Sequence, residues 1–472
     1  MNVELTSYDA LEHVDLPWQQ VKPAHWEVRR IKSLFREHSR TGFPQEPLLA
    51  ATQTMGVVRK DRYATRTVTA EKGLHLLKLV QPGDFVISLR SFQGGIELCH
   101  DQGIISPAYT VLEPVDPRFR DFFSILFKSR PFVAGLALFI TGIRDGQNIN
   151  YASLSRSYIS VPPLSEQQAI VKYVRHVDRE IRAAISVKQR LIALLGEQKH
   201  AIRHTALTRG LNTTQKLKES GIPGVAMIPA HWEVVRAKQL CHQIVDCKNR
   251  TPDLVPGGGY TVIRTTNVRS GEFRPTGSFE TDKKNYEIWT QRGAPRQGDV
   301  FFTREAPAGE ACLVPELTGL CMGQRMMYLR PNPAALDSRF LVHSIYGPAA
   351  RTYIDLATNG STVGHLRLGQ VGSLPVIWCP VDEQRAIVAH IDREWKPLNA
   401  AIARAEREIS LLREYQIRLT ADVVTGKLDV RAAALRLPDI DPHTPGLASV
   451  DRTAENGLDD ELDDDEAIAE SR

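Results

Sequence analysis

Residues 164–210 read LSEQQAIVKYVRHVDREIRAAISVKQRLIALLGEQKHAIRHTALTRG, and residues 381–426 read VDEQRAIVAHIDREWKPLNAAIARAEREISLLREYQIRLTADVVTG. Apolar residues recur in both stretches at alternating steps of four and three, a heptad spacing that is typical of helices paired through an apolar seam. At 1.5 Å per residue, each helix would be roughly 65 Å long. Pro397 interrupts the second pattern, so we expect a kink or a later helix start there.

Two such helices in one chain are expected to bury their seams against each other as an antiparallel pair. A simpler interpretation is a long helical hairpin that only provides spacing. The recurring apolar residues mark the face through which each helix would pair with the other. The expected helix-pairing residues are Ile170, Val174, Ile181, Leu191, Leu195 and Ile202 in the first stretch, and Ile391, Leu398, Ile402, Ile409, Leu412 and Leu419 in the second.

The chain contains an internal duplication. The hexapeptide PAHWEV occupies Pro23–Val28 and returns at Pro229–Val234, and each copy heads a segment that ends in one of the heptad stretches. This pattern predicts two copies of one unit with a pseudo-two-fold relation. His25 and Glu27 suggest a catalytic pair, but packing of the tryptophan and local hydrogen bonds by the polar residues are favoured, because a catalytic site does not normally need two copies.

Between hexapeptide and helix, short β-rich runs alternate with one or two helical patterns, which predicts a mixed α/β (α+β) domain in each copy. The expected organisation is a domain at 1–162, a helix at 163–211, a domain at 212–379, a helix at 380–428 and a disordered tail at 429–472.

Composition is that of a globular protein, with 42% hydrophobic and 24% charged residues among 472. No apolar run approaches the ~20 residues that span a bilayer. The six cysteines form no CxxC pair, which favours a reduced cytoplasm over disulfides or zinc. The net charge of +4 is unevenly distributed, because Pro438–Arg472 holds 12 acidic and 2 basic residues. The rest of the chain is therefore basic, and a polyanion is a natural partner.

Both variable domains contain loops rich in Arg, Lys, Asn and Thr. Arginine can pair with guanine, Asn or Gln can pair with adenine, and Lys, Ser and Thr can hold phosphates. Each loop taken alone could equally be a solvated turn, but together, in duplicate on a basic body, they favour DNA binding. The candidate DNA-binding residues are Arg59, Lys60, Arg62, Arg90, Ser91, Gln93, Arg144 and Asn148 in the first domain, and Lys248, Asn249, Arg250, Arg264, Thr266, Asn267, Arg304 and Arg325 in the second.

Catalytic signatures are missing from the sequence. There is no GxxxxGK[ST] phosphate loop, no HExxH, no GxSxG, and no Asn/Asp-Pro-Pro-aromatic tetrapeptide of the kind that amino-methyltransferases use. Together these absences favour a binding subunit over an enzyme, with no catalytic residue and no metal site of its own.

The order of these motifs resembles the specificity subunit of type I restriction-modification systems. The resemblance covers roughly residues 16–428 and includes the motifs Pro163–Gln167 (PLSEQ) and Pro380–Gln384 (PVDEQ). It implies two target recognition domains that each read half of a split DNA site, and conserved helices that fix the spacer between the halves.

The resemblance also implies partners and their cofactors. The subunit would be non-catalytic and cytoplasmic, and it would bind double-stranded DNA, two modification (methyltransferase) subunits and two restriction (motor-nuclease) subunits. S-adenosylmethionine, ATP and magnesium would belong to those partners, and this chain would bind no cofactor. Two alternatives remain open: a stand-alone sequence-specific DNA nuclease or methylase, and a coiled-coil scaffold that binds proteins.

Overall fold

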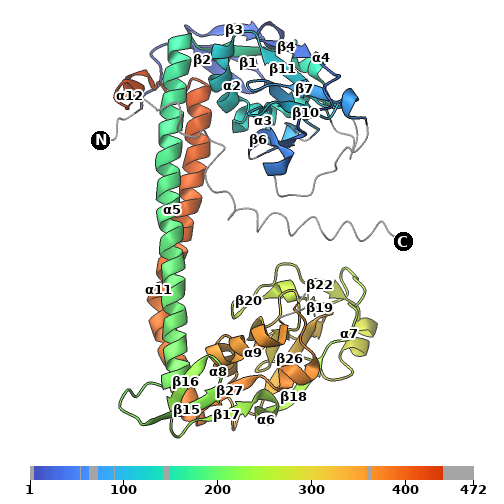
Figure 1. The fold of residues 1–472 in the computed structure, drawn as a ribbon, viewed down its shortest axis with the longest axis vertical. Coiled ribbons are helices and arrows are strands. Elements are labelled where there is room, and N and C mark those ends of the chain that lie inside the picture. The colour runs from blue at the N-terminus through green and yellow to red at the C-terminus, as the bar shows by residue number, and fades with distance from the viewer. Residues whose placement is uncertain are drawn as a thin grey trace. The chain divides into compact units, whose positions relative to one another are not determined.

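The computed structural model describes residues 5–53, 55–62, 73–89, 91–141, 148–358 and 364–438. The acidic stretch 439–472, expected to be disordered, lies outside the described residues. The chain forms two compact units, one made of residues 1–188 and 407–472 and the other of residues 189–406. We call them the first and the second unit. Each unit holds one variable domain and part of both long helices, which Figure 1 labels α5 and α11.

The first unit is built from short antiparallel strands and small helices. Its central sheet has the order β4-β11-β8-β9, beside five two-stranded pairs: β1-β2, β3-β14, β5-β6, β7-β10 and β12-β13. The strands are β1 (Leu11–Leu16), β2 (Gln19–Pro23), β3 (Glu27–Arg30), β4 (Phe35–His38), β5 (Leu49–Thr52), β6 (Gly56–Arg59), β7 (Lys78–Val80), β8 (Phe85–Ile87), β9 (Glu97–Leu98), β10 (Gly103–Ile105), β11 (Thr110–Pro114), β12 (Ile140–Thr141), β13 (Asn148–Ile149) and β14 (Tyr158–Val161). The helices are α1 (Ser91–Gly94), α2 (Arg120–Leu126), α3 (Arg130–Leu136) and α4 (Tyr151–Leu154).

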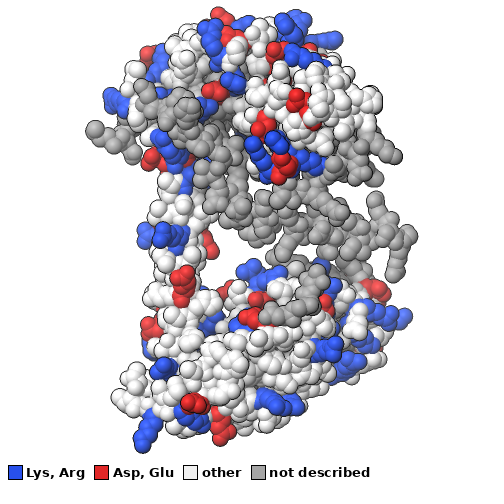
Figure 2. Space-filling model, viewed as in Figure 1, with Lys and Arg blue, Asp and Glu red and all other residues white. Residues whose placement is uncertain are grey.

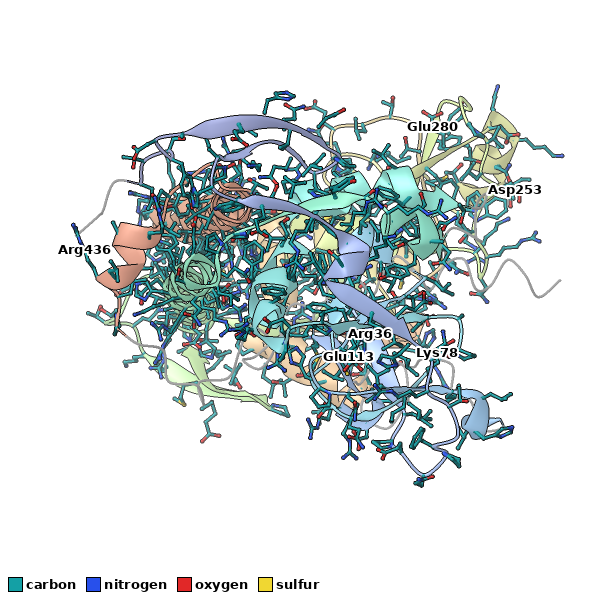
Figure 3. All side chains as sticks on the ribbon, turned by 90° about the horizontal axis from the view of Figure 1, so that it is seen from above. Arg36, Lys78, Glu113, Asp253, Glu280 and Arg436 are labelled. Carbon is teal, nitrogen blue, oxygen red and sulfur yellow. The ribbon has the colours of Figure 1, made fainter. Side chains whose placement is uncertain are left out.

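An aromatic core holds the sheet of the first unit against α2 and α3. Phe35 meets Phe85 and Phe123 edge to face, with ring centroids 5.6 and 5.1 Å apart. Such pairs add about 0.5–1.5 kcal/mol each beyond the burial of their area. The outer edge of the sheet is charged instead: Arg36 on β4 is the register partner of Glu113 on β11, and Figure 3 labels both.

The second unit repeats this plan with longer elements. Its four-stranded sheet has the order β18-β26-β23-β24, and a three-stranded sheet has the order β22-β19-β25. The strands are β15 (Leu217–Ile222), β16 (Val225–Pro229), β17 (Glu233–Arg236), β18 (Cys241–Asp246), β19 (Tyr260–Ile263), β20 (Val268–Arg269), β21 (Glu272–Phe273), β22 (Phe279–Thr281), β23 (Val300–Thr303), β24 (Ala311–Leu313), β25 (Leu320–Met322), β26 (Met326–Pro331) and β27 (Pro375–Trp378). The helices are α6 (Ala237–Leu240), α7 (Lys283–Trp289), α8 (Ser338–Ile345), α9 (Pro348–Thr358) and α10 (Leu368–Gly372).

The two units share a four-stranded sheet, a preceding hairpin and a closing strand pair, which confirms the internal duplication and the mixed α/β fold class. The hairpin β1-β2 pairs Leu11 with Pro23, and the hairpin β15-β16 pairs Leu217 with Pro229. Each hexapeptide then enters a strand, β3 or β17, that pairs with the strand just before a long helix, β14 or β27. The hexapeptide is therefore the point where each domain begins and closes on itself.

The long helices are α5 (Leu164–Arg209) and α11 (Val381–Val424), followed by the short α12 (Arg431–Leu435). They pair antiparallel within each unit. In the first unit, Asp178 accepts a hydrogen bond from Gln416, and Lys188 contacts Glu408. In the second unit, Trp395 donates to the carbonyl of Lys199 at 3.2 Å. The number of the α11 partner falls as that of α5 rises, as an antiparallel pair requires.

The seam agrees with the heptad pattern at most positions. Ile170, Val174, Ile181, Ile391, Ile409 and Leu419 are buried, while Leu195, Ile202, Leu398, Ile402 and Leu412 are half-buried. Leu191 is the exception, with 45% of its surface exposed. From Lys188 onward the shielded positions on α5 follow as Ile192, Leu195 and Lys199, so an extra four-residue step turns Leu191 outward.

Pro397 does not mark the start of α11, which begins at Val381 and runs through the proline. The helix continues there because its neighbours Trp395 and Leu398 are half-buried while Pro397 itself faces solvent. Within the described part of the chain, no single helix is long and apolar enough to cross a bilayer. Only the bent pair Pro117–Leu126 and Arg130–Phe139 would meet the length and composition requirement together.

Candidate DNA interface and the joint that supports it

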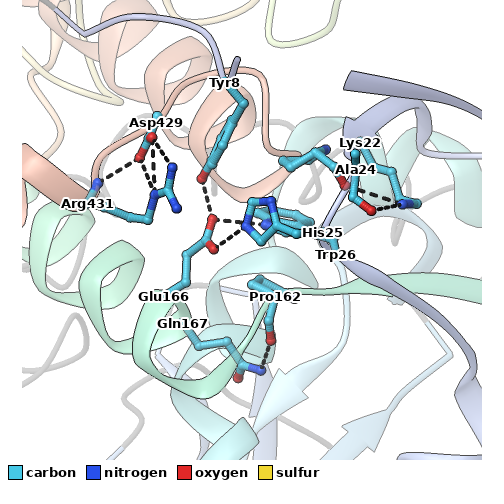
Figure 4. Close-up of polar contacts among 11 residues, drawn as sticks. Tyr8, Lys22, Ala24, His25, Trp26, Pro162, Glu166, Gln167, Asp429 and Arg431 are labelled. Carbon is cyan, nitrogen blue, oxygen red and sulfur yellow. Dashed lines mark hydrogen bonds and ion pairs between the residues drawn. The ribbon is translucent and has the colours of Figure 1, made fainter. Parts of the chain in front are cut away.

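The hexapeptide of the first unit is joined to the first turn of α5 by a buried carboxylate. Glu166 accepts hydrogen bonds from the Tyr8 hydroxyl at 2.5 Å and from the Trp26 indole at 2.9 Å, and its other oxygen lies 2.7 Å from His25 Nε2 (Figure 4). Glu166 is only 4% exposed. Burial and the Glu166 carboxylate raise the pKa of the Tyr8 phenol, so it stays a donor. The histidine therefore has a structural role in a network rather than a catalytic one beside Glu27.

The second unit has a reduced form of this joint. His231 Nε2 lies 3.0 Å from Glu383, the counterpart of Glu166, and both side chains are partly exposed. Thr214 occupies the position that corresponds to Tyr8, and the buried Trp232 indole N–H has no hydrogen-bond partner among the described residues. Gln384 adds other hydrogen bonds at this joint. Its amide donates to the carbonyls of Cys379 and Ala335, and its oxygen accepts from the Asp337 backbone.

Each joint also receives the end of the other long helix. Gly426, which ends α11 with φ +70°, sits against Pro23 and Trp26, and Gly210, which ends α5 with φ +67°, sits against Trp232. A Cβ at Gly426 would overlap the Pro23 ring, so glycine is required there by contact as well as by backbone angle. The backbone N–H of Asp429 then donates to the carbonyl of Thr6 at 2.9 Å. This bond joins the segment after α11 to the segment before β1.

The second unit brings most of its candidate DNA-binding loops together. The N–H of Gln324 reaches the Thr251 hydroxyl, Gly323 donates to Ile263, and Arg304 donates to the carbonyl of Arg325. The segments 248–251, 263–266, 304–305 and 323–325 therefore form one face, which we call the second loop face. The candidate DNA-binding residues on it whose side chains are exposed or half-buried are Lys248, Asn249, Arg250, Arg264, Thr266 and Arg325.

Trp289, at the end of α7, was missed by sequence reasoning. The Lys248 ammonium and the Arg250 guanidinium lie 5.6 and 5.7 Å from its ring centroid, and its indole donates to the carbonyl of Arg250 at 3.0 Å. Both cations are thus positioned by a ring that lies about 40 residues further along the chain. Nothing in the local sequence relates this tryptophan to the loop.

Acidic neighbours hold several of the arginines on this face. Arg325 Nε lies 3.6 Å from Glu305, which also meets His365 at 2.9 Å. Figure 2 shows that basic and acidic side chains alternate over the visible face of each unit instead of forming one large basic patch. Contact between Arg325 and a phosphate would therefore require exchange of an existing ion pair.

Three predicted DNA-binding residues are buried in the structure. Asn267 is fully buried, and its amide donates to the carbonyls of Arg274 and Thr276, so it holds the loop instead of reading a base. Arg304 is 9% exposed and pairs with Asp246 at 2.6 Å. Ser91 is 1% exposed, and its hydroxyl accepts from the backbone of Ser88. Local composition cannot distinguish a loop-forming polar residue from a ligand-facing one.

The candidates of the first unit form two groups. Arg59 pairs with Asp61 at 2.6 Å and Arg62 with Asp101 at 3.2 Å, with Lys60 half-buried between them. Gln93 is exposed on α1, and Asn148 is half-buried at the start of β13. Arg90 and Arg144 lie outside the described residues.

Lys128 fastens α1 to the body of the first unit. Its ammonium donates to the carbonyls of Gln53 and Gly94 at 3.0 and 2.7 Å and to the Glu97 carboxylate at 2.5 Å. Burial raises the pKa of Glu97 to about 7 despite the lysine. The second oxygen of Glu97 has no hydrogen-bond partner in the described part of the chain.

This carboxyl predicts a pH dependence of stability. Because its pKa in the folded protein lies above the unfolded value of 4.5, its contribution is largest below pH 4.5 and is lost as the pH rises through about 7. The free energy of unfolding of the first unit should therefore fall by up to about 3 kcal/mol over that range. Urea denaturation of the full chain at pH 5 and pH 8 measures the drop. Glu97→Gln should remove it, and an unchanged slope in that variant would refute the assignment.

The described residues were also compared with the requirements of a metal site. No group of three or more His, Cys, Asp or Glu side chains that could hold a metal ion occurs among the described residues. All six cysteines are unpaired, and burial raises the pKa of Cys99 and Cys241 to about 12. Both thiols are therefore neutral at physiological pH.

Comparison with known proteins places these features in a family context. The family model described as type I restriction modification DNA specificity domain matches residues 23–189 and again 229–408. A putative type I restriction enzyme MjaX specificity subunit from Methanocaldococcus jannaschii is 22% identical over 291 residues, which is 60% of this chain and 62% of that relative. The chain thus matches less than two thirds of that relative's length.

One solved structure supports the fold. A chain from a study of complex assembly and conformational transition of the type I R-M system has a TM-score of 0.58 at 18% identity, covering 86% of this chain and 99% of that one. The HsdS subunit from Thermoanaerobacter tengcongensis is also similar, with a TM-score of 0.43 at 17% identity, covering 86% of this chain and 98% of that one.

Proposed function

Because this chain belongs to the family of type I restriction modification DNA specificity domains, we propose that it is the DNA-reading subunit of a type I restriction-modification complex. It would recognise a split site in double-stranded DNA, one half with each unit. The chemistry would belong to its partners, and this chain would be non-catalytic. The observation that carries the proposal is the duplication of one fold whose loops differ between copies while the hexapeptide, the joint and the helices are kept.

The partners follow from the proposed role. Two modification subunits would bind S-adenosylmethionine and methylate adenine, and two restriction subunits would use ATP and magnesium. The solved structure with the higher TM-score comes from a study of complex assembly in a type I system, which supports association with partner subunits. This chain would bind no cofactor itself and would work in the cytoplasm.

A protection assay tests the proposal. The full chain, co-expressed with modification subunits from the same host, should protect two separated blocks of bases in one DNA fragment. Binding should weaken steeply with salt because phosphate contacts release counterions, so the assay is run at two stated ionic strengths. A single continuous block would contradict the split site. DNA cleavage or methylation by the pure chain with magnesium and S-adenosylmethionine would favour a stand-alone enzyme.

The paired helices give a geometric prediction. Inserting one matched heptad after Gln189 in α5 and after Glu406 in α11 should add about 10 Å to the pair, or roughly three base pairs of spacer. Both insertion points are at exposed residues, so the seam can be kept. Methylation mapping reads the spacer directly. A heptad in α5 alone, which shifts the seam, should instead abolish binding, and an unchanged spacer in the double insertion would show that the helices do not set it.

A further inference from the structure

The tips of the two equivalent hairpins carry residues of opposite size. Between β1 and β2 the chain reads Pro17-Trp18, and between β15 and β16 it reads Pro223-Gly224. Trp18 is 4% exposed. Gly224 has a φ of +83°, an angle that side-chain-bearing residues rarely adopt. The first unit thus has a buried indole where the second unit has no side chain.

The helix that each tip contacts has changed in a complementary way. In the first unit, Trp18 lies 4.8 Å from the Phe132 ring, centroid to centroid, and rests on Gly135 of α3. When α3 and α9 are aligned on Pro131 and Pro348, Ala349 stands in place of Phe132 and Thr352 in place of Gly135. Thr352 contacts Gly224 directly. The second unit therefore has neither of the two aromatic side chains that the first unit has at this location.

A cavity borders these positions in the second unit. It has a volume of about 260 Å³ and is lined by Ile222, Val234, Ala349, Thr352, Tyr353 and Leu356. Arg236 is at its edge, and its exposed side chain makes no ion pair among the described residues. Leu356 is 62% exposed, so the mouth is apolar as well as the walls. An apolar cavity of about 150 Å³ is already large enough to bind benzene.

We propose that this cavity is a docking site for an aromatic side chain, tryptophan or phenylalanine, that a partner polypeptide carries next to an acidic residue. The first unit shows which group fits the corresponding space, namely the indole of Trp18. The exposed Arg236 supplies charge complementarity for a neighbouring carboxylate. A polypeptide suits the site better than a metabolite does, because so few polar groups converge on the cavity. Buried tryptophan anchors in such pockets commonly dominate protein interfaces.

The aromatic group must be supplied by another chain rather than by the acidic carboxyl-terminal residues. The stretch 439–472 contains no Phe, Trp or Tyr. None of the residues that line the cavity belongs to the second loop face, so an occupant would contact a different set of residues from the DNA contacts proposed above.

Fluorine NMR with 5-fluoroindole tests the cavity. The full chain should bind this probe with a dissociation constant in the millimolar range or below, because it has only ten non-hydrogen atoms. Ala349→Phe places in the second unit the residue that the first unit has, and should weaken binding at least tenfold. Asp355→Phe, which adds the same ring at an exposed position of α9, should leave binding unchanged. If Ala349→Phe fails to fold, Leu356→Asp at the mouth should give the same loss.

Capped dipeptides test the occupant. N-acetyl-Trp-Asp-amide should bind at least threefold more tightly than N-acetyl-Trp-Lys-amide, and Arg236→Gln should abolish the difference. Failure of 5-fluoroindole to bind, or equal binding by Ala349→Phe, would overturn the site. Binding of 5-fluoroindole without either dipeptide would overturn the polypeptide assignment. DNA protection by Ala349→Phe should be normal, which separates this test from that of the proposed function.

Discussion

Replacing Glu166 with alanine should destabilise the first unit by about 3 kcal/mol, since each buried donor that loses its acceptor costs about 1–3 kcal/mol. The Tyr8 hydroxyl and the Trp26 indole both donate to Glu166, and both residues are less than a tenth exposed. The loss would also release the first turn of α5 from the hexapeptide. Chemical denaturation of the full chain, followed by fluorescence of the buried tryptophans, measures the change.

Glu383→Ala is the matched control, because it makes the same substitution at the second joint. Among the described residues, Glu383 forms its ion pair with His231, at 3.0 Å and partly exposed to solvent, so the cost should stay below about 1 kcal/mol. Equal losses in the two variants would show that the Tyr8 and Trp26 hydrogen bonds are not what stabilises the first joint.

Reversing both charges that contact Trp289, in the double variant Lys248→Glu and Arg250→Glu, should weaken DNA binding about 100-fold or more. Each specific base contact contributes about 1–3 kcal/mol, and each lost phosphate contact lowers the salt dependence by about one unit of slope. Titration of a duplex at several salt concentrations gives both quantities. The fold should be unaffected, because both residues lie in an exposed or half-buried loop.

A charge-matched control separates this effect from net charge. Lys216→Glu with Lys218→Glu changes the net charge by the same amount, on exposed residues at or just before β15 rather than on the second loop face. That variant should bind DNA almost normally. If both double variants weaken binding equally, the second loop face is not the interface, and the effect is one of overall charge.

Sequence reasoning was sufficient for the fold because its signals are periodic or repeated. The heptads of α5 and α11 and each copy of PAHWEV depend on residues close together in the chain. The exposure of Leu191 could not be predicted in this way, because a single extra four-residue step changes which face of a helix is buried without changing the composition of the helix.

The interface was harder to predict because its geometry depends on distant residues. Asn267 and Arg304 have side chains that suit base recognition, but Arg274 and Asp246 bind them inside the domain. Trp289 and Glu166 were not predicted as part of a site, but the structure gives each of them a role. Each gains that role only when a segment far away in the chain packs against it, a loop for Trp289 and the hexapeptide for Glu166. No spacing rule relates these partners in a single sequence.

The way the chain is partitioned has a consequence for its synthesis. The second unit consists of one uninterrupted segment, residues 189–406, whereas the first unit needs residues from both sides of it. A ribosome has synthesised every residue of the second unit before it makes Leu419, Val423 and Gly426, which complete the packing around Trp26. The domain whose translation begins first is therefore the last to have all of its residues available for folding.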